Sequence, residues 1–243
     1  MLVEARRARP VDFGGEKVQG ALLRVILFGG TGMVGLGVLR ECLRAPDVDL
    51  VVTIGRSATG VSDPKLRELV CADVGDLRAV ETEVAGFDAC FFSLGVSAAG
   101  MEEADYERIT YGLTMAAAET LSRLNPEMTF IYVSGAGTDS SEKGRVMWAR
   151  IKGRTENALL RLPLKAYIFR PGIIQPLDGI QSKTRAYRVL YKLTKPLLPL
   201  LRWALPNLVL STREIGRAML AVARRGYEKR ILETSDIRAV AGA

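Results

Sequence analysis

Short apolar runs alternate with longer segments of helical periodicity along most of this chain. The first run, Val25–Phe28, leads directly into a glycine-rich turn, and an amphipathic segment follows that turn. Apolar runs of this length, bounded by turn residues, are typical of strands that are buried on both faces of a sheet. The other predicted strands are Leu50–Ile54, Leu66–Cys71, Phe87–Ser93, Met128–Val133, Lys165–Arg170 and, at an edge, Ile231–Glu233.

The segments between these runs are predicted to be helices. They are Met33–Arg44, a helix that begins near Asp76, Glu102–Leu124, a helix that carries Trp148–Glu156, and Thr212–Arg224. This alternation predicts an α/β fold of the Rossmann type, a doubly wound parallel sheet with right-handed crossovers and helices on both faces. Ligands of such sheets bind beyond the carboxyl ends of the strands. Because we find no internal repeat and no low-complexity linker, we expect one domain over residues 21–243, with residues 1–20 as a loose extension.

The turn after the first strand is the centre of the predicted site. Gly29 can adopt the backbone conformation of a tight turn, Gly32 leaves room for a ligand phosphate, and Gly35 lets the helix lie close to the strand. Unpaired N–H groups and the positive dipole end at the helix start favour a diphosphate. The alternative interpretation is a glycine-rich turn that only packs. The predicted cofactor-binding residues of this turn are Gly29, Gly30, Thr31, Gly32, Met33, Val34 and Gly35.

The end of the second strand indicates which nicotinamide cofactor the chain prefers. Folds that prefer NAD place an Asp or Glu here to hydrogen-bond the adenosine ribose. No carboxylate lies between Leu50 and Ser62, and Arg56 is placed to meet a 2′-phosphate. NADP is therefore favoured over NAD. The alternative is that Arg56 is a solvated loop cation.

Residues after the other strands are expected to complete the site. Asp73 either accepts a hydrogen bond from the adenine amino group or caps the helix that begins near Asp76. Gly95 either lets the backbone approach the cofactor ribose or simply ends a strand. The remaining predicted cofactor-binding residues are Val74, Leu94, Val96, Pro171, Gly172, Ile173 and Ile174.

Composition removes several classes of chemistry. The chain has no histidine, which excludes Ser-His-Asp and Cys-His catalysis and the usual zinc sites, so no metal site is expected. Its three cysteines, Cys42, Cys71 and Cys90, are far apart and in apolar contexts. They are interpreted as reduced core residues of a cytoplasmic protein.

The charge of the chain changes this picture little. The net charge is +7, but the basic residues are spread along the sequence, so a phosphate-bearing ligand explains them and no nucleic-acid binding is expected. The sequence contains no run of about eighteen apolar residues, so no membrane-spanning helix is predicted. The segment 1–20 lacks the apolar middle of a signal peptide.

The pattern changes in residues 175–210, where leucines and tyrosines are interleaved with lysines and arginines and interrupted by prolines. One interpretation is an apolar flap over the substrate end of the pocket. A second is peripheral contact of residues 187–205 with anionic lipid. A third is a dimer interface.

Several ordered motifs together resemble the short-chain dehydrogenase/reductase superfamily. The chain looks most like its atypical and extended NAD(P)-binding epimerase-like members, including NmrA-like proteins and TIP30-like oxidoreductases. The resemblance covers residues 23–224 and rests on the glycine turn, Gly55-Arg56, Ser134, Lys152-Gly153 with Glu156, and Arg170-Pro171-Gly172. It implies nicotinamide cofactor chemistry, and a homodimer through helices near 102–124 and 141–160.

In that family a Ser, a Tyr and a Lys perform the reaction. The Tyr transfers the proton of the substrate oxygen, the Lys holds the nicotinamide ribose and lowers the Tyr pKa, and the Ser positions the substrate. Ser134 and Lys152 match, but Trp148 stands four residues before the lysine, where the family has tyrosine. An indole cannot ionise near neutral pH.

Three explanations of this substitution compete. A substitute such as Tyr106, Tyr111, Tyr132 or a water held by Ser134 donates the proton. Alternatively, the protein binds NADP without turnover, as a sensor or scaffold of the NmrA-like type. Lastly, Trp148 stacks on the nicotinamide or on an apolar substrate that needs no proton from the enzyme.

The leading prediction is an NADP-binding oxidoreductase or epimerase-like protein that acts on a small, apolar carbonyl or alcohol substrate. Its predicted catalytic residues are Ser134, Lys152 and Trp148.

Overall fold

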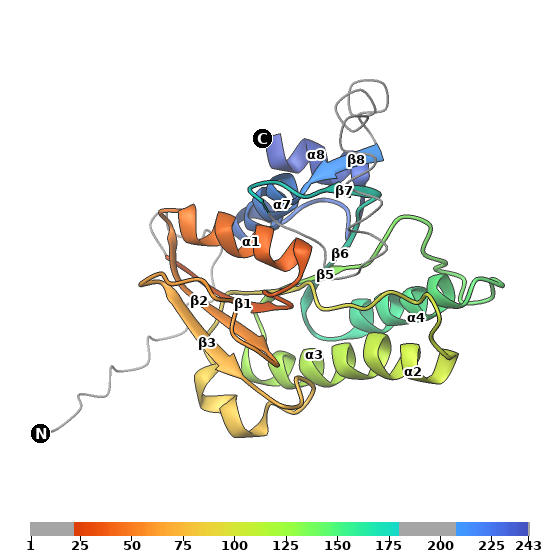
Figure 1. The fold of residues 1–243 in the computed structure, drawn as a ribbon, viewed down its shortest axis with the longest axis horizontal. Helices are drawn as coiled ribbons and strands as arrows, with labels where there is room; N and C mark the ends of the chain where they lie inside the picture. Colours follow the sequence, from red (N-terminus) through yellow and green to blue (C-terminus); the bar gives the residue numbers. More distant parts are fainter. Residues whose placement is uncertain (1–21, 180–207, 243) are drawn as a thin grey trace, which may run out of the picture.

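Seven parallel strands form the main sheet, in the order β3-β2-β1-β4-β5-β6-β9 (Figure 1). The structure is a computed structural model that describes residues 22–179 and 208–242. The strands are β1 Leu23–Phe28, β2 Val48–Gly55, β3 Leu66–Val70, β4 Ala89–Phe92, β5 Thr129–Val133, β6 Lys165–Arg170 and β9 Ile231–Glu233. Every neighbouring pair is parallel, which confirms the predicted doubly wound sheet.

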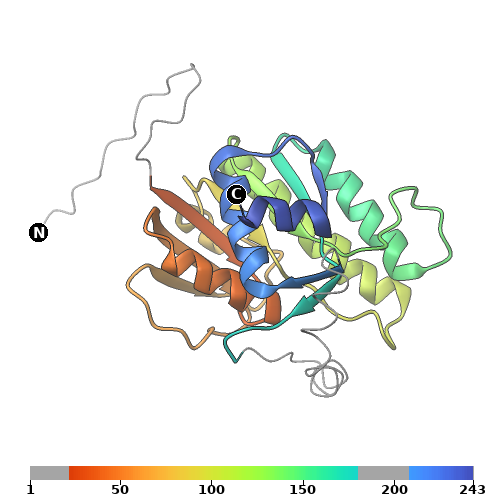
Figure 2. The same ribbon diagram turned by 90° about the horizontal axis from the view of Figure 1, so that it is seen from above.

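The strands are apolar because both of their faces are covered. In β1 the four residues from Val25 to Phe28 are fully buried, and β4 is buried at every position. On one face lie α1 (Met33–Arg44), α7 (Thr212–Arg225) and α8 (Thr234–Gly242). On the other face lie α3 (Leu113–Leu124) and α4 (Met147–Arg161), with α2 (Glu103–Glu107) packed beside α4 (Figure 2).

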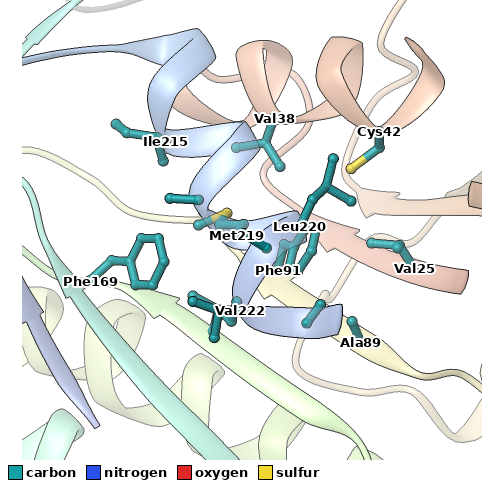
Figure 3. Packing of buried hydrophobic residues seen from close by; sticks show 14 of the residues in the cluster. Val25, Val38, Cys42, Ala89, Phe91, Phe169, Ile215, Met219, Leu220 and Val222 are labelled. Carbon is teal, nitrogen blue, oxygen red and sulfur yellow. The ribbon is translucent and has the colours of Figure 1, made fainter. Parts of the chain in front are cut away.

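The core on the α1–α7 face shows why the two helices belong to one domain. Val38 and Cys42 of α1 and Met219 and Val222 of α7 are buried together above Phe91 of β4 (Figure 3). The helix α7 begins with a capping box, in which the Ser211 hydroxyl accepts from the Glu214 N–H and the Glu214 carboxylate accepts from the Ser211 N–H. Residues more than 170 positions apart in sequence thus form a single core.

The predicted helix 102–124 is confirmed as one uninterrupted helical run over residues 103–124, but its hydrogen-bond pattern changes in the middle. A π-helical turn, Arg108–Gly112, separates α2 from α3. The helix predicted near Asp76 is a short 3-10 helix, η1 (Arg78–Glu83). Both departures are local changes of hydrogen-bond pattern, which the spacing of apolar residues does not reveal.

A second, two-stranded parallel sheet pairs β7 (Ile173–Gln175) with β8 (Val209–Ser211). The sequence did not predict either strand, because three residues show no measurable period. The pair brings together the two described ends of the predicted 175–210 flap. The flap residues 187–205 and the extension 1–20 lie outside the described residues, so these predictions stay untested.

Candidate functional site

A cleft of about 1430 Å³ lies beyond the carboxyl ends of the strands. It opens where the strand order reverses, with β2 on one side of β1 and β4 on the other, which is the usual ligand position in such sheets. Most residues predicted from the sequence line it: Gly29–Val34, Arg56, Asp73, Val74, Leu94, Gly95, Val96, Ser134, Lys152, Gly172, Ile173 and Ile174. Gly35, Trp148 and Pro171 do not belong to the lining.

The glycine turn has the geometry of a phosphate cradle. Gly29 has a φ of +79°, and a side chain there would lie 2.7 Å from the Ser93 carbonyl. A Cβ on Gly35 would lie 2.1 Å from the Gly29 oxygen, so α1 can start this close to β1 only with glycine at position 35. The start of α1 has no side-chain cap and no acidic residue in its first turn. Its free N–H groups therefore favour an anion, and a dinucleotide diphosphate fits this cradle.

Arg56 and Asp73 line the cleft just after the ends of β2 and β3. Arg56 is exposed and, within the described ranges, takes part in no hydrogen bond or ion pair. Asp73 Oδ1 accepts from the Gly75 N–H at 2.8 Å in a local turn. The 3-10 helix η1 begins after Leu77 without a side-chain cap, and Asp76 Oδ1 accepts from the Arg78 N–H at 3.1 Å in a second local turn. Asp73 is therefore not the helix cap, and the adenine contact stays a prediction.

Ser134 and Lys152 lie at the opposite end of the cleft. The Thr138 hydroxyl donates its one hydrogen to the Gly135 carbonyl at 2.8 Å. In the 3.0 Å contact between Ser134 Oγ and Thr138 Oγ1, the serine is therefore the donor, and its lone pairs are left to accept. Ser134 N–H also donates to the Phe169 carbonyl, which fixes the end of β5 beside β6.

Lys152 is half-buried, and its ammonium lies against Tyr132. Its Nζ is 3.5 Å from the Tyr132 hydroxyl and 5.3 Å from the ring centroid. Burial lowers the pKa of Lys152 to about 8, while the Glu156 carboxylate opposes this shift. Lys152 can therefore gain or lose a proton near neutral pH.

A buried ion pair between Arg170 of β6 and Glu156 of α4 lies next to this end of the cleft. Glu156 is completely buried one helical turn after Lys152, and Arg170 Nε donates to its carboxylate oxygens at 3.1 and 3.2 Å. Arg170 also reaches Glu233 of β9 at 3.2 Å. The resemblance drew attention to Glu156 and Arg170, but it gave no sign that they pair with each other.

Trp148 lies beside the loop that follows β5. A Cβ on Gly137 would be 3.6 Å from the outer edge of the indole ring. Pro171 accepts from the Ala136 N–H at 3.0 Å, so it braces the same loop. In the described part of the chain, the predicted stacking of Trp148 in the cleft has no geometric support, and its catalytic role stays a prediction.

The tyrosines considered as substitutes do not reach the cleft either. Tyr132 and Tyr106 are almost fully buried, and burial raises the pKa of Tyr132 far above its usual range. Tyr111 is stacked under the Arg154 guanidinium at 4.5 Å. Over residues 22–179 and 208–242, no tyrosine lines the cleft.

Some lining residues were missed by the sequence analysis. Arg108, Ile109 and Leu113 form a wall of the cleft, and Ser93 contributes a buried hydroxyl that has no hydrogen-bond partner in the described structure. Thr138, which fixes the Ser134 hydroxyl, was also missed. Ser93 could have been found as the last residue of a predicted strand, whereas nothing in the apolar pattern marks Arg108.

Solved structures with the same architecture include sugar epimerases and dehydrogenases. A UDP-N-acetylglucosamine 4-epimerase from Methanobrevibacter ruminantium has a TM-score of 0.66 and 15% identity, over 86% of this chain and 75% of that one. WbmF from Bordetella bronchiseptica, solved in complex with NAD+, has a TM-score of 0.65 and 14% identity, over 92% and 78%. The chain has the fold of the short-chain dehydrogenases and sugar epimerases. The suspected resemblance is thus confirmed at the level of the fold. A short-chain dehydrogenase family protein from Francisella tularensis, with a TM-score of 0.60 and 14% identity, covers 85% of this chain and 93% of that one.

Curated relatives are similar in sequence but have no activity in their names. The mitochondrial protein FMP52-2 of Scheffersomyces stipitis is 30% identical over 61% of this chain, and the match spans 65% of that relative's length. The mitochondrial protein fmp52-2 of Aspergillus oryzae is 25% identical, over 87% of this chain and 93% of the relative. No protein-family model matches the chain.

These relatives correct one prediction. We expected a cytoplasmic protein from the reduced cysteines and the polar start of the chain, and the relatives that overturn this are all named as mitochondrial proteins. Free cysteines do not distinguish the two compartments. In the described ranges, no helix is long and apolar enough to cross a bilayer.

Proposed function

We propose that this chain is an NADP-binding oxidoreductase or epimerase-like protein that acts on a small, largely apolar carbonyl or alcohol substrate. The cleft carries the proposal, because it joins a diphosphate cradle at one end to Ser134 and Lys152 at the other. Solved proteins of this fold include one in complex with NAD+. An apolar substrate is supported by Val133, Ile173 and Ile174, which line the Ser134 end.

Each residue of this chain has a defined task in the proposed reaction. Free N–H groups at the start of α1 bind the diphosphate, and the Lys152 ammonium holds the nicotinamide ribose. The Ser134 lone pairs can accept from an alcohol substrate while the serine hydrogen is donated to Thr138. To hold a carbonyl oxygen, Ser134 must turn this hydrogen from Thr138 to the substrate. When bound, the nicotinamide supplies or accepts a hydride.

Turnover is tested by NADPH oxidation against a panel of small ketones, aldehydes and quinones. We expect slow turnover, because no tyrosine lines the described cleft and general acid–base catalysis contributes ~10²–10⁴-fold. Lys152→Ala should abolish this turnover. Turnover that survives Lys152→Ala unchanged would contradict the placing of the site.

A second candidate function is an NADP sensor or scaffold without turnover. The position of Trp148 beside Gly137, with no tyrosine in the described part of the cleft, favours it. Three results together would support the sensor function. The chain binds NADP tightly, it still does so under the assay conditions, and no carbonyl of the panel oxidises NADPH.

The choice of NADP depends on Arg56. Its exposed guanidinium is free among the described residues to meet a 2′-phosphate, and a charge-assisted contact of this kind is worth roughly tenfold or more in affinity. Arg56→Ala should therefore weaken NADP binding by about that factor and leave NAD binding unchanged. Arg78→Ala, which removes an exposed arginine outside the cleft, is the control. Equal losses for both cofactors would refute the preference.

We also propose a mitochondrial location, supported by the relatives' names. Fractionation of cells that express the full chain with a carboxyl-terminal tag tests it. The tag should co-purify with mitochondria, and recovery in the soluble cytosolic fraction alone would contradict the proposal.

A further inference from the structure

One wall of the cleft is built on the π-helical turn between α2 and α3. In this turn the Leu113 N–H donates to the Arg108 carbonyl, five residues earlier. The Thr110 carbonyl accepts from the Thr114 hydroxyl at 2.6 Å. A side chain thus satisfies a carbonyl within the turn, and such turns occur often at functional sites.

The π-helical turn determines which side chains face the cleft. In a regular α-helix, residues five apart point about 140° away from each other. With the wider turn, Arg108 and Leu113 lie one turn apart, and both line the cleft. Leu113 packs beside the loop after β3, since a Cβ on Gly75 would be 2.9 Å from Leu113 Cδ2. The turn therefore brings an arginine to the cleft wall.

Arg108 and the glycine turn are on opposite walls. The glycine turn leads into α1 on one face of the sheet, whereas the π-helical turn leads into α3 on the other face (Figure 1). The glycine-turn residues Gly29–Gly35 include no cationic side chain, so this wall offers backbone N–H groups and the Thr31 hydroxyl. The positive charge of this wall is the partial charge at the start of α1, so a cationic side chain from another wall would strengthen the binding of a diphosphate.

The Arg108 guanidinium is available for this contact. Its side chain is 67% exposed, and its one ion-pair partner among the described residues is Asp105. That pair is 3.6 Å long, which is too long for a hydrogen bond, and exposed pairs of this kind contribute little.

We propose that Arg108 binds the diphosphate of a dinucleotide in the cleft, from the wall opposite the glycine turn. This rests on the proposed cofactor function and divides the phosphates between two arginines. Arg108 holds the diphosphate that NAD and NADP share, and Arg56 holds the 2′-phosphate that only NADP has.

Four ligands measured by calorimetry with the full chain separate the two contacts. ADP-ribose and NAD carry only the diphosphate, adenosine 2′-monophosphate carries only the 2′-phosphate, and NADP carries both. Arg108→Ala should weaken ADP-ribose, NAD and NADP alike, by roughly 10- to 100-fold, and leave adenosine 2′-monophosphate unchanged. Arg56→Ala should weaken only NADP and adenosine 2′-monophosphate.

Two control variants sharpen the result. Arg123→Ala removes an exposed arginine of α3 that does not line the cleft, and it should leave all four affinities unchanged. Asp105→Ala frees the guanidinium and should keep or improve ADP-ribose binding. Arg108→Lys should recover part of the loss, because charge remains without the forked donors.

The opposing outcomes are distinct. If Arg108→Ala binds ADP-ribose like the wild type, or loses only the ligands with a 2′-phosphate, the inference is wrong while the cofactor function stands. If the wild type binds none of the four ligands, the cofactor function itself fails and the inference fails with it.

Discussion

The two ends of the cleft differ in how they hold charge. The glycine-turn end is made mostly of backbone: free N–H groups at the start of α1, with exposed arginines at its borders. The Lys152 end is made of side chains that constrain one another, with Lys152 against Tyr132 and above the buried Glu156–Arg170 pair. In the proposed function, binding of a dinucleotide and chemistry on a substrate thus depend on separate parts of the structure. One part can keep its geometry while the other loses its usual tyrosine.

The largest expected effect comes from breaking the ion pair below Lys152. Glu156→Ala removes the fully buried carboxylate and leaves the largely buried Arg170 guanidinium with the half-exposed Glu233 carboxylate, and loss of a buried partner costs up to about 3–5 kcal/mol in the free energy of unfolding. Urea unfolding measures it. Glu233→Ala removes the half-exposed partner of the same arginine and should cost less than about 1 kcal/mol. Equal costs would show that burial does not set the strength of this pair.

Gly35→Ala should damage the opposite end. The added Cβ would lie 2.1 Å from the Gly29 oxygen, so α1 must move away from the turn, at about 1–3 kcal/mol of stability and with loss of NADP binding. At Gly95 a Cβ meets no atom within 4 Å. Gly95→Ala should therefore leave the melting temperature unchanged, but it should weaken NADP binding because Gly95 lines the cleft. Unchanged NADP binding in both variants would contradict the placement of the cofactor at the glycine-turn end of the cleft.

The pH dependence of cofactor binding should report on Lys152 alone. Its pKa of about 8 means that the ammonium, and with it the ribose contact, is lost as the pH rises through that value. NADP affinity should fall between pH 7 and 9, whereas Lys152→Arg should give a nearly flat profile. The same shift raises the free energy of unfolding as the pH rises from about 8 to 10.5. In that range the lysine of the unfolded chain still binds a proton, whereas Lys152 of the folded chain has lost it. A wild-type affinity that rises with pH would contradict the assignment.

The smallest effect is expected at Trp148. Because its ring lies beside Gly137 and does not line the cleft, Trp148→Phe should change NADP affinity by less than about twofold. Fluorescence titration with NADPH measures this. A large loss would place the indole on the nicotinamide, as one explanation from the sequence holds.

The sequence predicted the sheet and the tight glycine turn well, since apolar runs and glycines act locally. It could not predict the π-helical turn at Arg108, because the residues of α3 keep their ordinary helical spacing to one another after a single i to i+5 turn. It also could not show that Arg170 pairs with Glu156, a contact made only when β6 lies beside α4. The orientation of Trp148 depends on the loop after β5, and sequence spacing carries no information about that loop.

Calorimetric titration of the wild-type chain with NADP tests the central claim most directly. The account predicts a single site with clear heat of binding, and an affinity for NADP above that for NAD. A well-folded chain that gives no binding signal with either cofactor would contradict it.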